Sequence, residues 1–269
     1  MTIRRRKIFF WIQIAVILYC SIGIALYYLQ EKFIFHPAPL PASHTYKFTS
    51  PFEELNIALN KTDTINLIRF KTKEKPKGAV VYYHGNRDNV EHYAKYVPYF
   101  TGMGYEVWMP DYPGYGKSRG LRTEKKLYEL AWQVQALART HFGDDSILIY
   151  GKSLGTGVAA YAATVWPCRG VVLETPYYSI TDLFSQYAFI YPTAIMSNYK
   201  IPTWKYLEDV SAPISIFHGT DDGVIPLRSA NKLKRVLKPG DRFFTIPGGE
   251  HNNLPTSEIY RRAMDSILR

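Results

Sequence analysis

A serine lies between two glycines in the segment Gly151–Gly155, which reads GKSLG. The apolar run 147–150 precedes the segment and a helix-prone stretch at 158–163 follows it, so the serine is expected at a sharp turn from a strand into a helix. Such a turn favours glycine on both sides, because a Cβ at either position would collide with neighbouring backbone. Free N–H groups at the start of the helix would stabilise negative charge that develops there. A role as a helix cap would account for a serine at this position, but it would not require a glycine on both sides. The whole pattern therefore predicts that Ser153 is a nucleophile.

A serine hydroxyl needs a base to take its proton, and the base needs an acid to orient it. In strand–turn–helix sites of this kind, the acid and then the histidine follow the serine along the chain. Two histidines follow Ser153, and the first, His218, begins the loop that carries the candidate acids Asp221 and Asp222. His251 comes after the last predicted strand. The order therefore predicts that His251 is the base and that Asp221 or Asp222 is the acid.

Two backbone N–H groups are expected to form an oxyanion hole for the charge on a tetrahedral intermediate. The first is the N–H of Leu154, directly after the nucleophile. The second should come from the loop after an early strand, where residues 84–86 follow the apolar run 79–83. Glycine at position 85 allows close approach, and the N–H of Asn86 is the predicted donor.

Apolar strands alternate with helical patterns over most of the chain. Helices are predicted near 90–103, 123–141, after 153, near 227–237 and at the carboxyl terminus. Continuous apolar strands separated by helices predict an α/β fold with a mostly parallel central sheet and helices on both faces. Ligands bind at the carboxyl ends of such strands, which is where the candidate residues lie. The predicted strands are at 55–59, 65–70, 79–83, 106–109, 146–150, 171–173, 214–217 and 243–246.

An aromatic-rich stretch at about 176–210 interrupts this alternation and is predicted to be an insertion over the top of the sheet. Its aromatic side chains could form a lid that grips an acyl chain, or they could fill the core. The sequence leaves both open. The aromatic residues in question are Tyr177, Tyr178, Phe184, Tyr187, Phe189 and Tyr191.

The segment Ile8–Leu29 carries no charge over 22 residues and has aromatic residues at both ends, as expected of a transmembrane helix. No small-x-small site for signal cleavage follows it. Basic residues at 4–7 place the amino terminus in the cytoplasm, so the rest of the chain is expected on the periplasmic, lumenal or extracellular side. The predicted organisation is a cytoplasmic tip and anchor at 1–30, a proline-containing tether at 31–52 and one catalytic domain at 53–269.

Composition narrows the classes of function. The chain of 269 residues has 33 Lys and Arg against 23 Asp and Glu, a net charge of +10, and part of this excess sits in the run before the apolar segment. No basic stretch lies on a recognisable nucleic-acid module, so anionic lipid is the expected partner of the charge and nucleic acid is not. Two cysteines support neither a disulfide scaffold nor a cysteine metal site. No histidine pair has metal-ligand spacing, and no cofactor is expected.

Five motifs occur in order along the chain: Tyr83–Asn86, Asp111–Ser118, Gly151–Gly155, His218–Asp222 and Gly249–Asn252. Together they resemble the membrane-anchored α/β-hydrolase-domain family. That resemblance implies the α/β-hydrolase fold and, from the family pattern HGxxDxxV/IP, makes Asp222 the preferred acid over Asp221. It also implies hydrolysis of acyl esters or thioesters, such as lysophospholipids, monoacylglycerols or palmitoylated cysteines. The chain departs from its relatives at Arg87, where they often carry a small residue.

The sequence therefore predicts a single-pass, membrane-anchored serine hydrolase with the triad Ser153, Asp222 and His251. Its expected substrates are amphiphilic acyl esters or thioesters, cleaved through an acyl-enzyme intermediate. A serine peptidase or amidase on the same triad is the first alternative. A non-catalytic membrane-bound binding protein is the second, although an intact set of catalytic residues argues against it.

Overall fold

A computed structural model describes residues 3–269 and contains an eight-stranded sheet in the order β10-β9-β8-β7-β4-β6-β3-β2. Neighbouring strands are parallel except where β3 pairs with β2 and with β6. A separate short parallel pair joins β1 (His36–Pro37) to β5 (Arg87–Asp88). The predicted mostly parallel sheet is confirmed. Its strands are β2 (Phe52–Ala58), β3 (Thr64–Phe70), β4 (Gly78–Tyr83), β6 (Tyr105–Pro110), β7 (Ile147–Lys152), β8 (Gly170–Glu174), β9 (Ile214–Gly219) and β10 (Arg242–Ile246).

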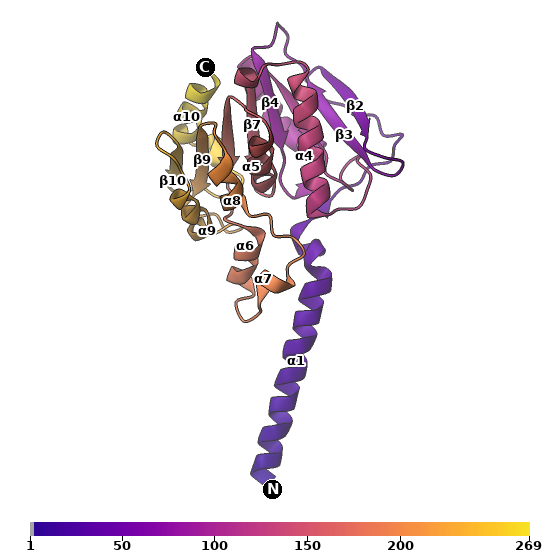
Figure 1. Ribbon diagram of the computed structural model, residues 1–269, viewed down its shortest axis with the longest axis vertical. Coiled ribbons are helices and arrows are strands. Elements are labelled where there is room, and N and C mark those ends of the chain that lie inside the picture. The colour runs from indigo at the N-terminus through magenta and orange to yellow at the C-terminus, as the bar shows by residue number, and fades with distance from the viewer. Residues whose placement is uncertain (1–2) are drawn as a thin grey trace.

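Helices cover both faces of the sheet (Figure 1). On one face α4 (Glu124–Arg139) and α5 (Gly155–Val165) pack with Val81 of β4, and on the other α3 (Val97–Gly102) and α10 (Glu258–Leu268) pack with Val80. Successive side chains of β4 thus pack into the hydrophobic cores on opposite faces of the sheet, which explains why the central strands are apolar throughout.

The stretch predicted as one helix over 90–103 is broken. It forms α2 (Val90–Tyr93), a 3₁₀ turn at Ala94–Tyr96, and then α3, in which Pro98 lies in the first turn. Proline has no N–H to continue a helical ladder but suits the first turn of a new helix. The predicted helix near 227–237 is likewise divided into α9 (Leu227–Asn231) and a 3₁₀ turn.

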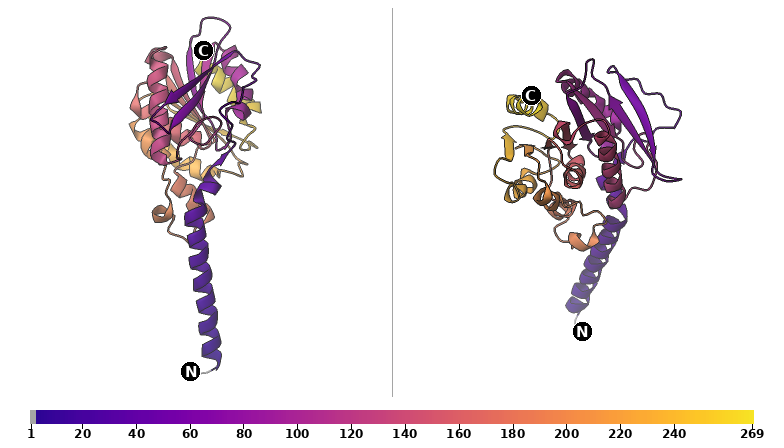
Figure 2. Two further views of the ribbon diagram at one scale, coloured as in Figure 1. Left: turned by 90° about the vertical axis from the view of Figure 1, so that its right-hand side faces the viewer. Right: turned by 45° about the horizontal axis from the view of Figure 1, so that its top comes forward.

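The amino-terminal helix α1 (Ile3–Ile34) is longer than the predicted span and projects away from the domain, on the side opposite the carboxyl terminus (Figure 2). It is the one candidate membrane-spanning helix in residues 3–269. The segment predicted as a tether at 31–52 begins as the last turn of this helix, because Ile34 and Phe35 are buried against the domain. The chain beyond it also packs on the domain, since Leu40 N–H donates to Gly116 O and Tyr46 is buried.

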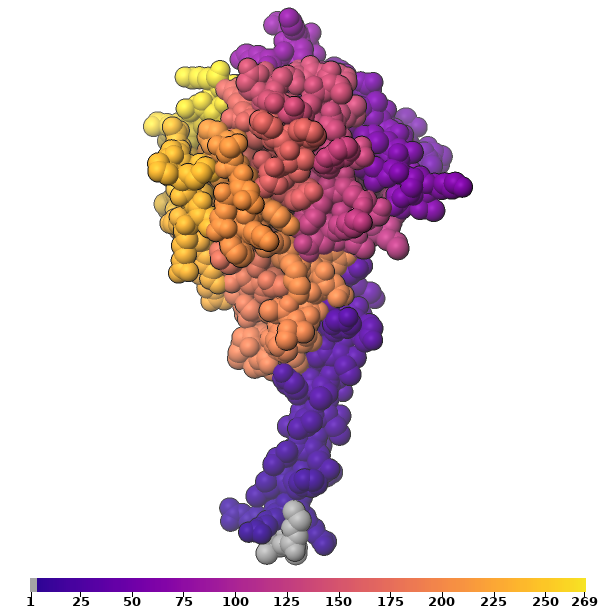
Figure 3. Space-filling view, in the orientation of Figure 1, coloured from indigo at the N-terminus to yellow at the C-terminus, as the bar shows by residue number. Residues whose placement is uncertain are grey.

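The predicted insertion forms three short helices, α6 (Ile180–Tyr187), α7 (Thr193–Met196) and α8 (Thr203–Asp209). Helix α8 packs on α5 at the edge of the sheet domain, whereas α6 and α7 lie beside α1 (Figures 1 and 3). We call residues 180–196 the lid. The lid meets the domain on the side from which α1 leaves it.

Candidate active site

Ser153 occupies the turn between β7 and α5 with a φ of 52°, a left-handed conformation that a serine rarely adopts. A Cβ on Gly151 would come within 2.6 Å of the backbone oxygen of Gly155, and one on Gly155 within 2.0 Å of Tyr83 O. These clashes are the physical reason for both glycines. The predicted strand–turn–helix setting of the serine is therefore present, and a side chain at either glycine would force the neighbouring backbone to shift.

Ser153, His251 and Asp222 form a continuous chain of hydrogen bonds. His251 Nδ1 lies 2.8 Å from Asp222 Oδ2, and His251 Nε2 lies 3.0 Å from Ser153 Oγ. A carboxylate can only accept, so Nδ1–H donates to Asp222 and Nε2 is left to accept from the serine hydroxyl. The imidazole thus has the tautomer that a general base needs.

The adjacent carboxylates Asp221 and Asp222 have different surroundings. Asp221 is exposed and its side chain accepts from Thr220 Oγ1. Asp222 is buried, and its second oxygen accepts from the N–H groups of Val224 and Ile225, both at 2.8 Å. Burial raises the pKa of Asp222, but the His251 hydrogen bond and the two backbone donors outweigh it and hold the pKa below its usual range. Asp222 is therefore the carboxylate that contacts His251 and stays ionised.

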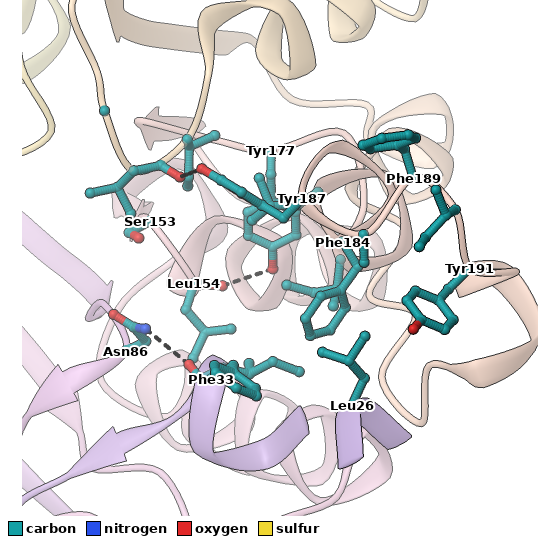
Figure 4. A pocket seen from close by; sticks show the side chains of 18 of the residues that line it. Leu26, Phe33, Asn86, Ser153, Leu154, Tyr177, Phe184, Tyr187, Phe189 and Tyr191 are labelled. Carbon is teal, nitrogen blue, oxygen red and sulfur yellow. Dashed lines mark hydrogen bonds between the residues drawn. The ribbon is translucent and has the colours of Figure 1, made fainter. Parts of the chain in front are cut away.

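The two predicted oxyanion donors line the same cavity as Ser153 (Figure 4). Neither the Leu154 N–H nor the Asn86 N–H donates to another group within residues 3–269. Asn86 is fixed by its other atoms, since its Nδ2 donates to Ile34 O at 2.9 Å and its O accepts from Tyr115 Oη at 2.7 Å. Both N–H groups are thus available to a ligand beside the serine.

A buried ion pair supports the histidine loop, and the sequence prediction missed it. Lys152 and Glu174 end the neighbouring parallel strands β7 and β8 in register and form an ion pair beneath the site. Lys152 Nζ also donates to the backbone oxygen of His251 at 3.3 Å. Glu174 accepts from the Tyr150 hydroxyl in addition. The signal in the sequence was a charged residue at the end of each of two apolar strands.

Two further histidines lie buried outside the hydrogen-bonded chain. His84 Nε2 lies 3.2 Å from Asp111 Oδ1, and Asp111 also accepts from Val90 N–H. Complete burial raises the pKa of the Asp111 carboxyl. Burial lowers the pKa of His218, whose Nδ1 contacts the oxygen of the next residue. Neither histidine contacts Ser153, and no cluster of potential metal ligands occurs in the part of the chain that the structure describes.

A cavity of about 780 Å³ opens beside Ser153, and its lining is mostly apolar. One wall comes from the lid and the opposite wall from α1, which the sequence prediction treated only as an anchor (Figure 4). The insertion aromatics differ in their burial. Tyr177 is buried in the core, whereas Phe189 is 81% exposed. Five of the six insertion aromatics line the cavity: Tyr177, Phe184, Tyr187, Phe189 and Tyr191.

The chain is similar to several known proteins. A family model described as serine aminopeptidase, S33, matches residues 74–206. Protein ABHD12B of Homo sapiens is 29% identical over 202 residues, covering 65% of this chain and 56% of its own. α/β-Hydrolase domain-containing protein 17C of Xenopus tropicalis is 28% identical over 203 residues, covering 70% of this chain and 59% of its own. These matches support an α/β-hydrolase-domain family for this chain.

Solved structures agree with this α/β-hydrolase fold. An esterase of Pyrococcus furiosus superimposes with a TM-score of 0.66 at 18% identity, over 87% of this chain and 97% of its own. A monoacylglycerol lipase of Paleococcus ferrophilus gives a TM-score of 0.58 at 20% identity, over 76% of this chain and 98% of its own. The chain spans somewhat more than half the length of the two curated relatives named above.

Proposed function

We propose that this protein is a membrane-anchored serine hydrolase that cleaves carboxylic esters or thioesters of acyl, lipid-like substrates. The observation that carries the proposal is the hydrogen-bonded chain from Asp222 through His251 to Ser153, at 2.8 and 3.0 Å, facing an apolar cavity. The positive φ of Ser153 and the two free N–H groups beside it support the same reaction.

The reaction proceeds in two halves. Ser153 Oγ attacks the acyl carbonyl while His251 Nε2 takes its proton, and Asp222 stabilises the imidazolium that results. The N–H groups of Asn86 and Leu154 bind the oxyanion, each contributing about 3 kcal/mol to transition-state stabilisation in typical sites. His251 then protonates the leaving alcohol or thiol. Water, deprotonated by His251, attacks the acyl-enzyme and releases the carboxylic acid and the free serine.

The matched family description makes a serine peptidase the second candidate, since the same triad can cleave amides. An aminopeptidase must bind the positive amino group of its substrate, which calls for a carboxylate in the site. No Asp or Glu lines the cavity among the described residues, and its surface is dominated by Leu, Ile and aromatic side chains. An acyl chain fits this lining better than a charged peptide terminus.

The membrane part of the proposal rests on α1. Its apolar side chains between Ile8 and Leu18 lie outside the packed domain, and its length exceeds the roughly 30 Å hydrocarbon core at about 1.5 Å per residue. The basic residues 4–7 support a cytoplasmic amino terminus with the catalytic domain on the opposite side.

A substrate panel tests the function. The purified full chain is assayed in detergent with p-nitrophenyl esters from C2 to C16 and with aminoacyl p-nitroanilides, alongside Ser153→Ala. We expect ester turnover with a chain-length optimum, and at least a thousandfold loss in the variant. Preferential cleavage of the anilides would favour the peptidase, and no turnover of either class by folded protein would leave a binding protein.

A further inference from the structure

The substrate cavity is built partly by the membrane helix. Ile22, Leu26 and Phe33 of α1 line it together with the lid, and Ser153 lies at its far end (Figure 4). Since Ile22 and Leu26 belong to the uncharged segment 8–29, the same helix face that would lie in a bilayer forms the wall of an active-site cavity.

The lid is fastened to α1 at two levels. Near the middle of the apolar segment, the Tyr19 hydroxyl donates to Ile190 O and the Tyr191 hydroxyl donates to Tyr19 O, both at 3.0 Å. The two tyrosine rings also stack, with centroids 4.6 Å apart. About three turns further along, Gln30 Nε2 donates to Met196 O at 3.3 Å. These contacts hold the lid along the second half of the apolar segment.

The position of Tyr19 sets the depth of the lid. From Tyr19 to Leu29 the helix rises about 15 Å, and from Ile8 to Tyr19 about 16 Å, at about 1.5 Å per residue. If the lid stayed in water, only the part of α1 from Ile8 to Tyr19 would be left to cross the bilayer, and this part is little more than half as long as the roughly 30 Å hydrocarbon core is thick. A helix that crosses the bilayer must therefore take the lid into it.

The lid has the composition that this position requires. After Asp182 the lid carries no charge, and the uncharged stretch continues beyond the lid to Tyr199, over 17 positions in all. The most exposed lid side chains are apolar, with Phe189 at 81% and Ile195 at 83%. The Tyr19 hydroxyl gives the Ile190 carbonyl a hydrogen-bond partner at a depth where water is absent.

We infer that the lid lies within the leaflet on the side of the catalytic domain, and that an amphiphilic acyl ester resident in that leaflet enters sideways between the lid and α1. Its acyl chain occupies the cavity along Leu26, and its carbonyl reaches Ser153. This inference rests on the proposed function. It makes α1 part of the substrate site and names the substrate class as bilayer lipids with an accessible acyl ester, in preference to esters dissolved in water.

A depth measurement tests the position of the lid independently of activity. A nitroxide is attached at Ile195→Cys in a Cys20→Ala, Cys168→Ala background, and the full chain is placed in nanodiscs. Ile259→Cys on α10, a comparably apolar exposed site of the sheet domain, is the control. We expect oxygen to relax the nitroxide at 195 more than a water-soluble nickel chelate does, and the reverse at 259. Preferential relaxation by nickel at both sites overturns the inference.

The cavity wall is tested by a second pair of variants. Leu26→Trp fills the cavity from α1, whereas Ile24→Trp adds the same volume at a neighbouring α1 position that is 60% exposed and does not line the cavity. The ratio of hydrolysis of a C16 ester held in the nanodisc to that of a C4 ester is expected to fall at least tenfold in Leu26→Trp and less than twofold in Ile24→Trp. Equal ratios in the two variants contradict the inference.

The two proposals fail in different ways. Wild-type protein that cleaves dissolved short esters but not the bilayer ester remains a serine hydrolase and refutes sideways entry. Protein that cleaves neither ester refutes the proposed function, while the nitroxide measurement still decides the depth of the lid.

Discussion

The Asp222→Asn variant tests the proposed role of the carboxylate most sharply, because its surroundings dictate how the amide must lie. The N–H groups of Val224 and Ile225 both donate to Asp222 Oδ1 at 2.8 Å. An asparagine NH₂ cannot face two donors, so its oxygen takes that side and its NH₂ points at His251 Nδ1. His251 must then carry its proton on Nε2, which turns the base into a donor toward Ser153 Oγ.

A base in the wrong tautomer costs about 10⁴ in kcat in serine hydrolysis. This corresponds to about 5.5 kcal/mol, at about 1.36 kcal/mol for each factor of ten. We expect that loss for a C4 p-nitrophenyl ester at pH 8, in a variant that still folds cooperatively. Asp221→Asn is the matched control and should keep at least half the activity, because Asp221 is exposed and its side chain accepts only from Thr220. A folded Asp222→Asn variant with more than a tenth of wild-type kcat would refute the reasoning.

Three further outcomes follow from the packing and charges of the site. Gly155→Ala places a methyl group 2.0 Å from a backbone oxygen, so we expect the free energy of unfolding to fall by about 1–3 kcal/mol in a urea titration. Gly102 has open space around it, so Gly102→Ala should lose less than half as much in the same titration. Lys152→Met leaves the Glu174 carboxylate buried without a cation, so the free energy of unfolding should fall by about 3–5 kcal/mol. Adding Glu174→Gln should recover part of this loss. If Lys152→Met were as stable as the wild type, the buried ion pair between Lys152 and Glu174 would be contradicted. The pKa of Asp222 is lower in the folded protein than its ordinary value of about 4. The ionised carboxylate therefore stabilises the fold fully above about pH 4, and this stabilisation is lost as the pH falls through the folded-state pKa. Asp222→Asn removes this term, so the fall of Tm below about pH 4 should be flatter in the variant.

Much of the fold could be predicted from local pattern. Each buried strand is a short apolar run followed by a polar or glycine residue, and each of these runs became a strand. The helix predicted over 90–103 was wrong in its continuity, and Pro98 carried the signal, since proline without an N–H starts a new helix more readily than it extends an old one.

Site residues whose identity follows from their order along the chain could be predicted from the sequence. Residues whose role depends on how strands and loops pair in the fold could be predicted less well. Ser153 and His251 follow from order and flanking residues. Asp221 and Asp222 are adjacent, so the residues alone left the acid open and the family pattern favoured Asp222. Which of the two side chains faces His251 depends on how their loop packs against the loop of His251, where the Asp221 N–H donates to the backbone oxygen of Gly249. The pairing of Lys152 with Glu174 depends likewise on which strands are neighbours.

The cavity wall supplied by α1 was not predictable from the apolar segment. Hydropathy indicates that residues 8–29 can cross a membrane, but it does not tell which helix face meets the protein. Gly23 is the local signal, since a Cβ there would lie 3.0 Å from a ring carbon of Tyr191. The glycine allows the lid to approach the helix closely, a contact that only the folded chain reveals.

The most direct test of the central claim is covalent labelling of the full chain with a fluorophosphonate probe, followed by peptide mass spectrometry. The account predicts a single phosphonylated residue, Ser153, with labelling abolished in Ser153→Ala and slowed by orders of magnitude in Asp222→Asn. Folded wild-type protein that takes no label, or a label that persists in Ser153→Ala, would contradict the account.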